Sequence, residues 1–265
     1  MTADEMKAAK KLADGGNTDT MLQIADFFYE IRGEKPDALE IAKRYYALAA
    51  QSGESRAILV MRDISAAAAD TSLSLVDVLG KNESMKGKVY EAYRWEKTAF
   101  DKGLFTDRKQ AEDRLLERIS HLAGFYYLEN SCSEILQIAE GVDHPYANVL
   151  CGLARYQLAS CGEDRKNAFD SLKDLQNDLA WKEEYTQYKF QRHLLVDAAQ
   201  ALAVLYYELR RDATAAFHVL EMTQSHLQYV DRCLRQQLEE VMSCYQKGAF
   251  GRYKYTGPRN GEKDD

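Results

Sequence analysis

The hydrophobic positions of the chain recur with helical spacing, and one short arrangement of them appears three times. A large aliphatic residue is followed directly by a small residue, and an aromatic residue stands three positions after the small one. Residues three and four apart lie on the same side of an α-helix, so the three form one patch on the helix surface. The small residue lets a neighbouring backbone approach closely, which predicts paired helices. The three copies are residues 24–29, 122–127 and 202–207.

A second arrangement belongs to the partner helix of such a pair. Residues 42–53 contain a pattern of alanines and aromatic residues that recurs 50 residues later, at 92–103, and each copy ends in glycine. Glycine readily adopts the left-handed conformation that closes a helix. Two alternating kinds of helix predict an all-α solenoid of antiparallel helical hairpins, with roughly 10–12 helices in a chain of this length.

Composition supports a helical fold. The 265 residues are 46% hydrophobic, enough for a continuous core, and include only three prolines, Pro36, Pro145 and Pro258. Because proline breaks helices, so few of them in a long chain favour helix throughout.

The second helix, written A-x-x-[W/Y]-x-x-x-A-x-x-x-G, resembles the Sel-one-like repeat, a relative of the tetratricopeptide repeat. The best copy is Ala92–Gly103, and residues 141–168 resemble the start and middle of another unit. The resemblance extends loosely over residues 4–230. It implies an α-α superhelix whose concave groove is lined by the first helix of each pair and binds another macromolecule.

The same resemblance implies which residues face the groove. The residue after each repeated aromatic is a tyrosine, and a row of tyrosines offers rigid apolar rings with one hydroxyl each. The alternative is that these rings pack between neighbouring repeats. The candidate partner-binding residues are Tyr29, Tyr127 and Tyr207, flanked by Asp26, Gln200 and Glu208.

Two segments depart from a plain repeat. Residues 65–88 are predicted as an insert with a short helix capped by Thr71 or Ser72, either a partner-touching flap or padding at an edge. Residues 107–130 and 181–211 predict unusually long helices, the second belonging to a long C-terminal hairpin over residues 181–247. We expect one helical-repeat domain over residues 1–247.

Residues 248–265 are predicted as a flexible tail. Between Lys247 and Gly261 the chain is basic and aromatic without one acidic residue. Such segments dock in protein grooves or contact nucleic acid, and termini are often simply flexible. The candidate tail contacts are Arg252, Tyr253, Lys254 and Tyr255.

The net charge, the cysteines and the N-terminal sequence limit the classes of function that we expect. The net charge of −7 argues against a surface built mainly to neutralise phosphates. Five cysteines without a C-x-x-C pair fit reduced thiols in the cytoplasm. The N-terminal residues lack the apolar core of a signal peptide, and no stretch reaches the ~20 apolar residues of a membrane span.

No catalytic, dinucleotide-binding or metal-binding motif is present in the sequence, and its five histidines are scattered. We therefore expect no enzyme activity, cofactor, metal or small-molecule substrate. The predicted function is that of an adaptor, scaffold or assembly subunit that binds a peptide, helix or tail of a partner protein. The alternative is a regulatory or nucleic-acid-associated subunit that uses the basic aromatic tail.

Overall fold

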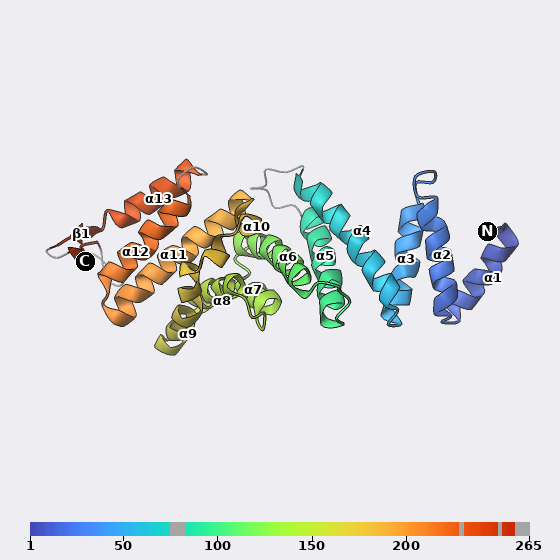
Figure 1. Cartoon of the computed structure of the whole chain (residues 1–265), viewed down its shortest axis with the longest axis horizontal. Helices are drawn as coiled ribbons and strands as arrows, with labels where there is room; N and C mark the ends of the chain where they lie inside the picture. The colour runs from blue at the N-terminus through green and yellow to red at the C-terminus, as the bar shows by residue number, and fades with distance from the viewer. Residues whose placement is uncertain (75–82, 228–230, 249–250, 258–265) are drawn as a thin grey trace. The chain divides into compact units, whose positions relative to one another are not determined.

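A computed structural model describes residues 1–74, 83–227, 231–248 and 251–257. These residues form 13 α-helices, two 3₁₀ helices and two short strands (Figure 1). The all-α prediction is confirmed. The described helices exceed the predicted 10–12 because the region expected as one long helix from residue 181 is divided.

The chain separates into two compact units, whereas we expected a single domain over residues 1–247. Unit 1 contains the described residues up to Arg118, and unit 2 those from Ile119 onward. The division falls within helix α6 (Arg108–Leu128).

Unit 1 is built from consecutive helices that pack in sequence order. Helix α2 packs on α3 and α4 packs on α5, while α1 and α3 join these pairs to their neighbours (Figure 1). The helices are α1 (Ala3–Asp14), α2 (Thr18–Glu30), α3 (Ala38–Gln51), α4 (Ser55–Ser74) and α5 (Glu83–Asp101), followed by the first part of α6.

The repeated sequence patterns form the core of unit 1 as predicted. Ile24 and Ala25 of α2 are buried, and so are Ala42 and Ala49 of α3. The alanines leave room for the neighbouring helix, as helix packing requires. Each glycine that ends the second pattern has a positive φ, 92° at Gly53 and 66° at Gly103, which closes α3 and α5.

The predicted insert falls partly outside the described residues. Its short helix was expected to carry Leu75, Val76 and Leu79, which lie in that part. Thr71 and Ser72 continue helix α4 instead of capping a new helix. The rest of the predicted insert belongs to the two long helices α4 and α5.

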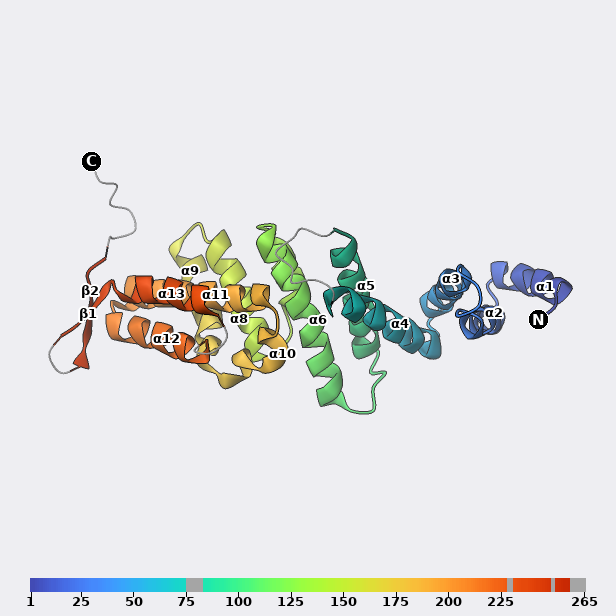
Figure 2. The ribbon, with the colours of Figure 1, turned by 90° about the horizontal axis from the view of Figure 1, so that it is seen from above.

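Unit 2 contains two further helical hairpins, α8 on α9 and α11 on α12. Helix α11 also packs on α8 and α9, and α13 packs on α11 and α12 (Figure 2). Leu202 and Ala203 of α11 are buried, as are Leu122 and Ala123 of α6. The helices are α7 (Cys132–Ala139), α8 (Pro145–Leu158), α9 (Gly162–Leu172), α10 (Glu183–Thr186), α11 (Lys189–Arg210), α12 (Ala213–His226) and α13 (Arg232–Met242), with 3₁₀ helices at Lys173–Gln176 and Asp178–Trp181.

The helix predicted from residue 181 to 211 begins only at Lys189. Tyr188 has an extended backbone with ψ of 149°, which interrupts the helical path between α10 and α11. Its backbone N–H is satisfied by the Gln191 side chain at 2.9 Å. In place of the expected C-terminal hairpin, the structure has one long helix, α11, and two shorter helices, α12 and α13, preceded by the short helix α10.

Two short strands follow the helices. Strands β1 (Tyr245–Lys247) and β2 (Tyr253–Tyr255) pair antiparallel, with Tyr245 opposite Tyr255. Strand β2 packs against α12 (Figure 2). Residues 251–257 thus differ from the flexible tail predicted there, and residues 258–265 lie outside the described part.

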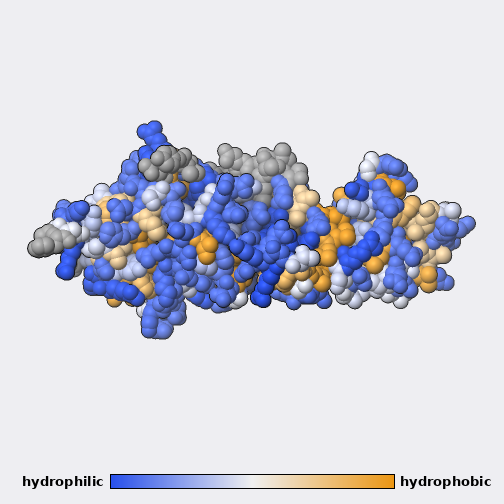
Figure 3. All heavy atoms as spheres, in the orientation of Figure 1, coloured by the Kyte–Doolittle hydropathy of each residue, from blue (hydrophilic) through white to orange (hydrophobic). Residues whose placement is uncertain are grey.

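The surface of unit 2 on the side shown in Figure 3 is mostly hydrophilic, with scattered apolar residues. Among the helices described, none combines the length and apolar character needed to cross a membrane.

Candidate functional site

The three predicted tyrosines lie near the C-terminal ends of α2, α6 and α11, and all are half-buried. Tyr29 belongs to unit 1, and Tyr127 and Tyr207 belong to unit 2. Every one of these rings has a neighbour within its own unit, so each tyrosine has a packing role.

In unit 1, Tyr29 and Asp26 of α2 belong to a small cluster that also includes residues of α3 and α4. The ring of Tyr29 meets Tyr46 edge-on at 6.1 Å, and the Arg32 guanidinium lies 3.9 Å from its centre. Asp26 accepts a 2.6 Å hydrogen bond from the Tyr46 hydroxyl and pairs with Arg56 at 2.9 Å. Burial and the bond to Asp26 raise the pKa of Tyr46 well above its usual value.

In unit 2, Tyr127 links α6 to α11. Its hydroxyl donates a 2.6 Å hydrogen bond to Asp197. Burial, together with that carboxylate, raises the pKa of Tyr127 far above the ordinary value for a phenol. The hydrogen bond fixes the ring in one orientation.

The two predicted flanking residues of α11 have different surroundings. Glu208 forms an ion pair with Arg165 of α9 at 2.5 Å. Gln200 is half-buried, and its Nε2 atom is enclosed without a hydrogen-bond partner among the described residues. An enclosed donor without a partner costs free energy, so this amide weakens the packing of α11.

One predicted tail residue contacts one of the predicted groove tyrosines. The ring of Tyr253 stacks on Phe217 of α12, and its backbone N–H donates to the Thr214 hydroxyl at 3.0 Å. Tyr255 lies against Tyr207, with ring centres 4.9 Å apart. The structure therefore brings together two sets of residues that the sequence predicted separately.

These contacts border a hollow of about 230 Å³, here called the C-terminal hollow. Arg252, the remaining predicted tail contact, is exposed on the hairpin and does not line the hollow. The lining consists of aromatic, basic and small residues, namely Tyr207, Arg211, Ala213, Tyr253, Lys254, Tyr255 and Gly257.

A larger depression, the α8–α9 groove, has a volume of about 550 Å³. The sequence alone did not indicate this groove, and the exposure of the apolar residue Leu158, at 53%, is seen only in the structure. The Arg155 guanidinium donates hydrogen bonds to the Ser171 hydroxyl and to the Glu140 carboxylate, which holds its side chain in place at the groove. The lining residues are Leu136, Asn148, Arg155, Leu158, Asp164, Asn167, Asp170 and Ser171.

One carboxylate of the groove is held by the start of α9. Asp164 accepts hydrogen bonds from the Cys161 thiol and from the backbone and hydroxyl of Ser160. These bonds, with that of Cys161 foremost, lower the pKa of the Asp164 carboxyl. The groove therefore keeps a negative charge at neutral pH.

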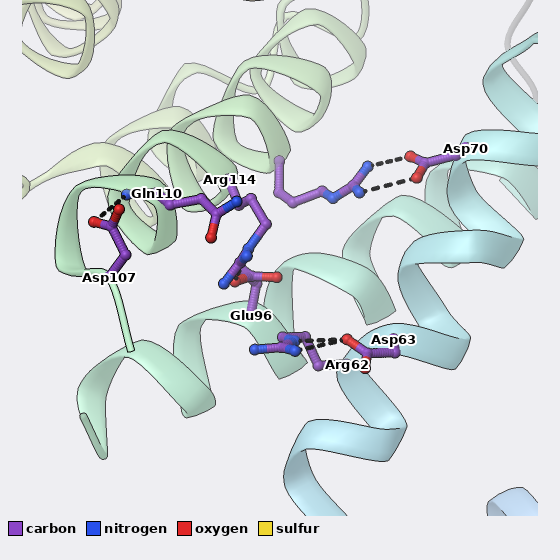
Figure 4. A network of polar contacts seen from close by, with 8 residues as sticks. Arg62, Asp63, Asp70, Glu96, Asp107, Gln110 and Arg114 are labelled. Carbon is purple, nitrogen blue, oxygen red and sulfur yellow. Dashed lines mark hydrogen bonds and ion pairs between the residues drawn. The ribbon is translucent and has the colours of Figure 1, made fainter. Parts of the chain in front are cut away.

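Unit 1 contains a network of ion pairs between α4, α5 and α6 (Figure 4). Arg118 holds both carboxylate oxygens of Asp70, at 2.5 and 3.2 Å. Burial opposes the charge on Arg118, but the Asp70 carboxylate outweighs it and raises the pKa of the guanidinium. Arg114 pairs through Nε with Glu96, whose side chain is only 4% exposed.

A hollow of about 420 Å³ lies beside this network and is lined in part by Arg62, Asp107, Gln110 and Arg114. Arg62 pairs with the adjacent Asp63 at 2.7 Å (Figure 4). Since Arg62 and Arg114 each have a carboxylate partner, their charges are balanced. We assign the network to the packing of α4, α5 and α6.

Within the described residues, no three or more His, Cys, Asp or Glu side chains are grouped so as to hold a metal ion.

Comparison with known proteins gives no relative. No protein-family model, no curated protein and no solved structure matches this chain. The fold defines an all-α protein of paired helices, and the resemblance to the Sel-one-like repeat rests on the sequence motifs alone.

Proposed function

We propose that the protein is a non-catalytic interaction module, an adaptor or assembly subunit, that holds a peptide, helix or tail of a partner protein. The observation that carries this proposal is the α8–α9 groove in unit 2, with its mixed apolar and hydrogen-bonding lining. Peptide-binding surfaces combine apolar contacts with a few polar groups that fix orientation.

The side chains of the groove suit an extended or helical segment. Leu136 and Leu158 offer apolar contact area, and the amides of Asn148 and Asn167 offer hydrogen-bonding groups. Asn148 already donates to Asp174 at 2.8 Å, which orients its amide. An amide retains donor and acceptor capacity after one such bond, and it can therefore pair with a peptide backbone.

Charge adds a preference for the segment. Arg155 is paired with Glu140, and Asp164 carries a negative charge at neutral pH. Asp170 pairs weakly with Lys173, at 3.4 Å, on the exposed side of α9. A partner segment with apolar and basic side chains complements this lining best.

The tyrosines of unit 2 are a second contact region in this proposal. Tyr127 is fixed by its bond to Asp197, and fixed aromatic rings lose little conformational entropy when a partner binds. We place the protein in the cytoplasm, where its five free thiols would stay reduced.

Affinity capture with a tagged full-length chain from native lysate tests the proposal. The Leu158→Asp variant should lose a stoichiometric protein partner that the unaltered chain retains. Leu179→Asp is the matched control, since Leu179 is 40% exposed but lies outside the groove. If both variants lose the partner equally, or if both retain it, the groove is not the partner-binding site.

The alternative, nucleic-acid binding through the tail, is favoured by the exposed basic residues Arg252 and Lys254. The stacking of Tyr253 on Phe217 weighs against it, because one face of that ring is already covered. A nuclease-treated arm and a salt series separate the two. Phosphate-driven capture disappears with nuclease and weakens steeply with salt, whereas groove binding does neither.

A further inference from the structure

We propose that the C-terminal hollow is an anion-binding site for a phosphate or carboxylate group carried on an aromatic or apolar stem of a partner protein. The site is separate from the α8–α9 groove, and the proposal does not depend on the groove. It stands on charge, on the backbone of Arg211 and on the preformed aromatic walls.

The charge of the lining is positive among the residues that the structure describes. Arg211 and Lys254 contribute two cations, and none of the described lining residues carries a carboxylate. Neither cation forms an ion pair within the described part of the chain. This contrasts with Arg62 and Arg114 of unit 1, which both have carboxylate partners. An anion would give the hollow the charge partner that the described residues do not supply.

The backbone of Arg211 is held in an unfavourable conformation. It ends helix α11 in the left-handed region with φ of 54°, where glycine or asparagine is the ordinary choice. Its N–H donates to the Tyr207 carbonyl at 3.1 Å, and its guanidinium lies 5.5 Å from the centre of the Tyr207 ring. Strain of this kind persists where the surroundings enforce it, and it is concentrated at functional sites.

The walls are fixed in place before any ligand arrives. The Tyr253 N–H is bonded to Thr214, and the Thr256 N–H donates to the Cys244 carbonyl at 2.7 Å. Stacking of Tyr253 on Phe217 and contact of Tyr255 with Tyr207 hold the rings. A preformed site loses less entropy on binding, which favours recognition of a small group.

Gly257 leaves room for the Tyr255 ring that forms one wall of the hollow. A Cβ atom at this position would lie 2.7 Å from the Tyr255 hydroxyl oxygen and 2.9 Å from Cys244 Cβ. Any side chain there would displace the Tyr255 ring that forms one wall. Glycine therefore preserves the aromatic wall beside the two cations.

Aromatic and basic walls together select a ligand with two parts. The guanidinium donates hydrogen bonds in a fork that matches carboxylate and phosphate oxygens, and the tyrosine rings contact a flat or apolar stem. The overall charge of −7 disfavours a long polyanion but not a single anionic group. These features favour a protein segment over a nucleic acid.

The test is isothermal titration calorimetry of the full chain with four probes: phenyl phosphate, benzoate, inorganic phosphate and phenol. Phenyl phosphate or benzoate should bind saturably, more tightly than inorganic phosphate, and phenol should not bind measurably. Comparing the dissociation constants of phenyl phosphate and benzoate shows which anionic group the site prefers. Absence of saturable binding by both aromatic anions would overturn the proposal.

Variants locate the site. Arg211→Asn removes the cation but tolerates the left-handed backbone, and it should weaken phenyl phosphate binding about tenfold, the usual loss for one charged hydrogen-bonding group. Lys254→Gln should weaken it by a smaller factor. Arg210→Gln is the matched control, because the Arg210 guanidinium lies over Phe169 and not in the hollow. An equal effect of Arg210→Gln would show that general surface charge, and not the hollow, holds the anion.

Two further arms separate this site from the groove and from nucleic acid. Leu158→Asp should leave probe binding unchanged, so failure of the groove and failure of the hollow are distinguishable. A peptide with phosphotyrosine should bind more tightly than a short single-stranded oligonucleotide. Tighter binding of the oligonucleotide, lost in Arg211→Asn, would overturn the assignment to a protein segment.

Discussion

The ring of Tyr253 lies almost parallel to that of Phe217, with centres 3.7 Å apart and 12° between the planes. One ring belongs to strand β2 and the other to helix α12, so this pair fastens the C-terminal hairpin to the helices of unit 2. The same contact fixes one wall of the C-terminal hollow. Stability of the hairpin and binding in the hollow are therefore coupled through Tyr253.

Tyr253→Ala should loosen the hairpin. We expect a double-mutant cycle of Tyr253→Ala with Phe217→Ala to give a coupling free energy of about 1 kcal/mol, as for other aromatic pairs. Amide hydrogen exchange of residues 253–256 measures the local opening of the hairpin in each variant, and urea denaturation measures the global stability for comparison. Tyr253→Phe retains the ring and should retain protection. Purely additive effects would mean that the stacking contributes nothing beyond burial.

Gly152→Ala should destabilise unit 2. A Cβ atom there would lie 2.7 Å from Leu172 Cγ and 2.8 Å from the Leu172 backbone N, so α8 and α9 would have to separate. Overpacking of this kind costs roughly 1–3 kcal/mol, measurable by urea denaturation. Gly87→Ala in α5 is the control, because nothing lies within 4 Å of its Cβ position. Alanine there should stabilise by about 0.5–1 kcal/mol, since glycine weakens a helix interior.

Arg114→Met should destabilise unit 1 by about 2 kcal/mol, because it leaves the buried Glu96 carboxylate without its cation. The loss is smaller than for a fully buried pair, as Arg114 is 35% exposed. Arg62→Met is the matched control: its partner Asp63 is 69% exposed and stays hydrated, so we expect a loss under about 1 kcal/mol. Urea denaturation of both variants measures these losses. The double variant Arg114→Met with Glu96→Gln removes the buried carboxylate as well and is measured in the same way. Equal losses in the two single variants would contradict the expected difference.

Acidification should destabilise unit 2 through His226. Its ring stacks on Trp181 at 4.8 Å, and burial lowers its pKa below the ordinary 6.5. The unfolded chain then binds the proton more tightly, so stability falls as pH decreases from above about 6.5 toward the folded-state pKa. Urea denaturation at pH 7.5 and 5.5 measures the difference, and His226→Gln should reduce it. Burial also lowers the pKa of His193, which would leave a residual dependence in the variant.

The local part of the fold followed from sequence because its causes are local. The pattern of aliphatic, small and aromatic residues repeats with the period of a helix, and Ile24, Leu122 and Leu202 are buried in their helices as that period predicts. Gly53 and Gly103 end helices because no other residue adopts their backbone so readily. Sequence therefore predicted the all-α class and the helices that carry the repeated patterns.

The candidate binding sites could be predicted only in part from the sequence. The sequence pattern singled out Tyr207, Tyr253 and Tyr255 as aromatic residues suited to contacts, but it assigned them to two separate sites. It did not single out Arg211, whose position in the left-handed region depends on how α11 ends and α12 begins. Nor did it indicate the α8–α9 groove, because a groove is a property of how two helices pack.

What the sequence by itself determined is the helical character and the pairing of helices through small residues, whereas the aromatic residues that it singled out for binding stay a prediction. Only the tertiary structure decided the division into two units, the bond from Tyr127 to Asp197 and the approach of Tyr255 to Tyr207. Helices form from interactions between residues three or four positions apart. These other features join residues about 50 to 70 positions apart, or arise from three-residue strands that carry no periodic signal, so they exist only once the helices have packed.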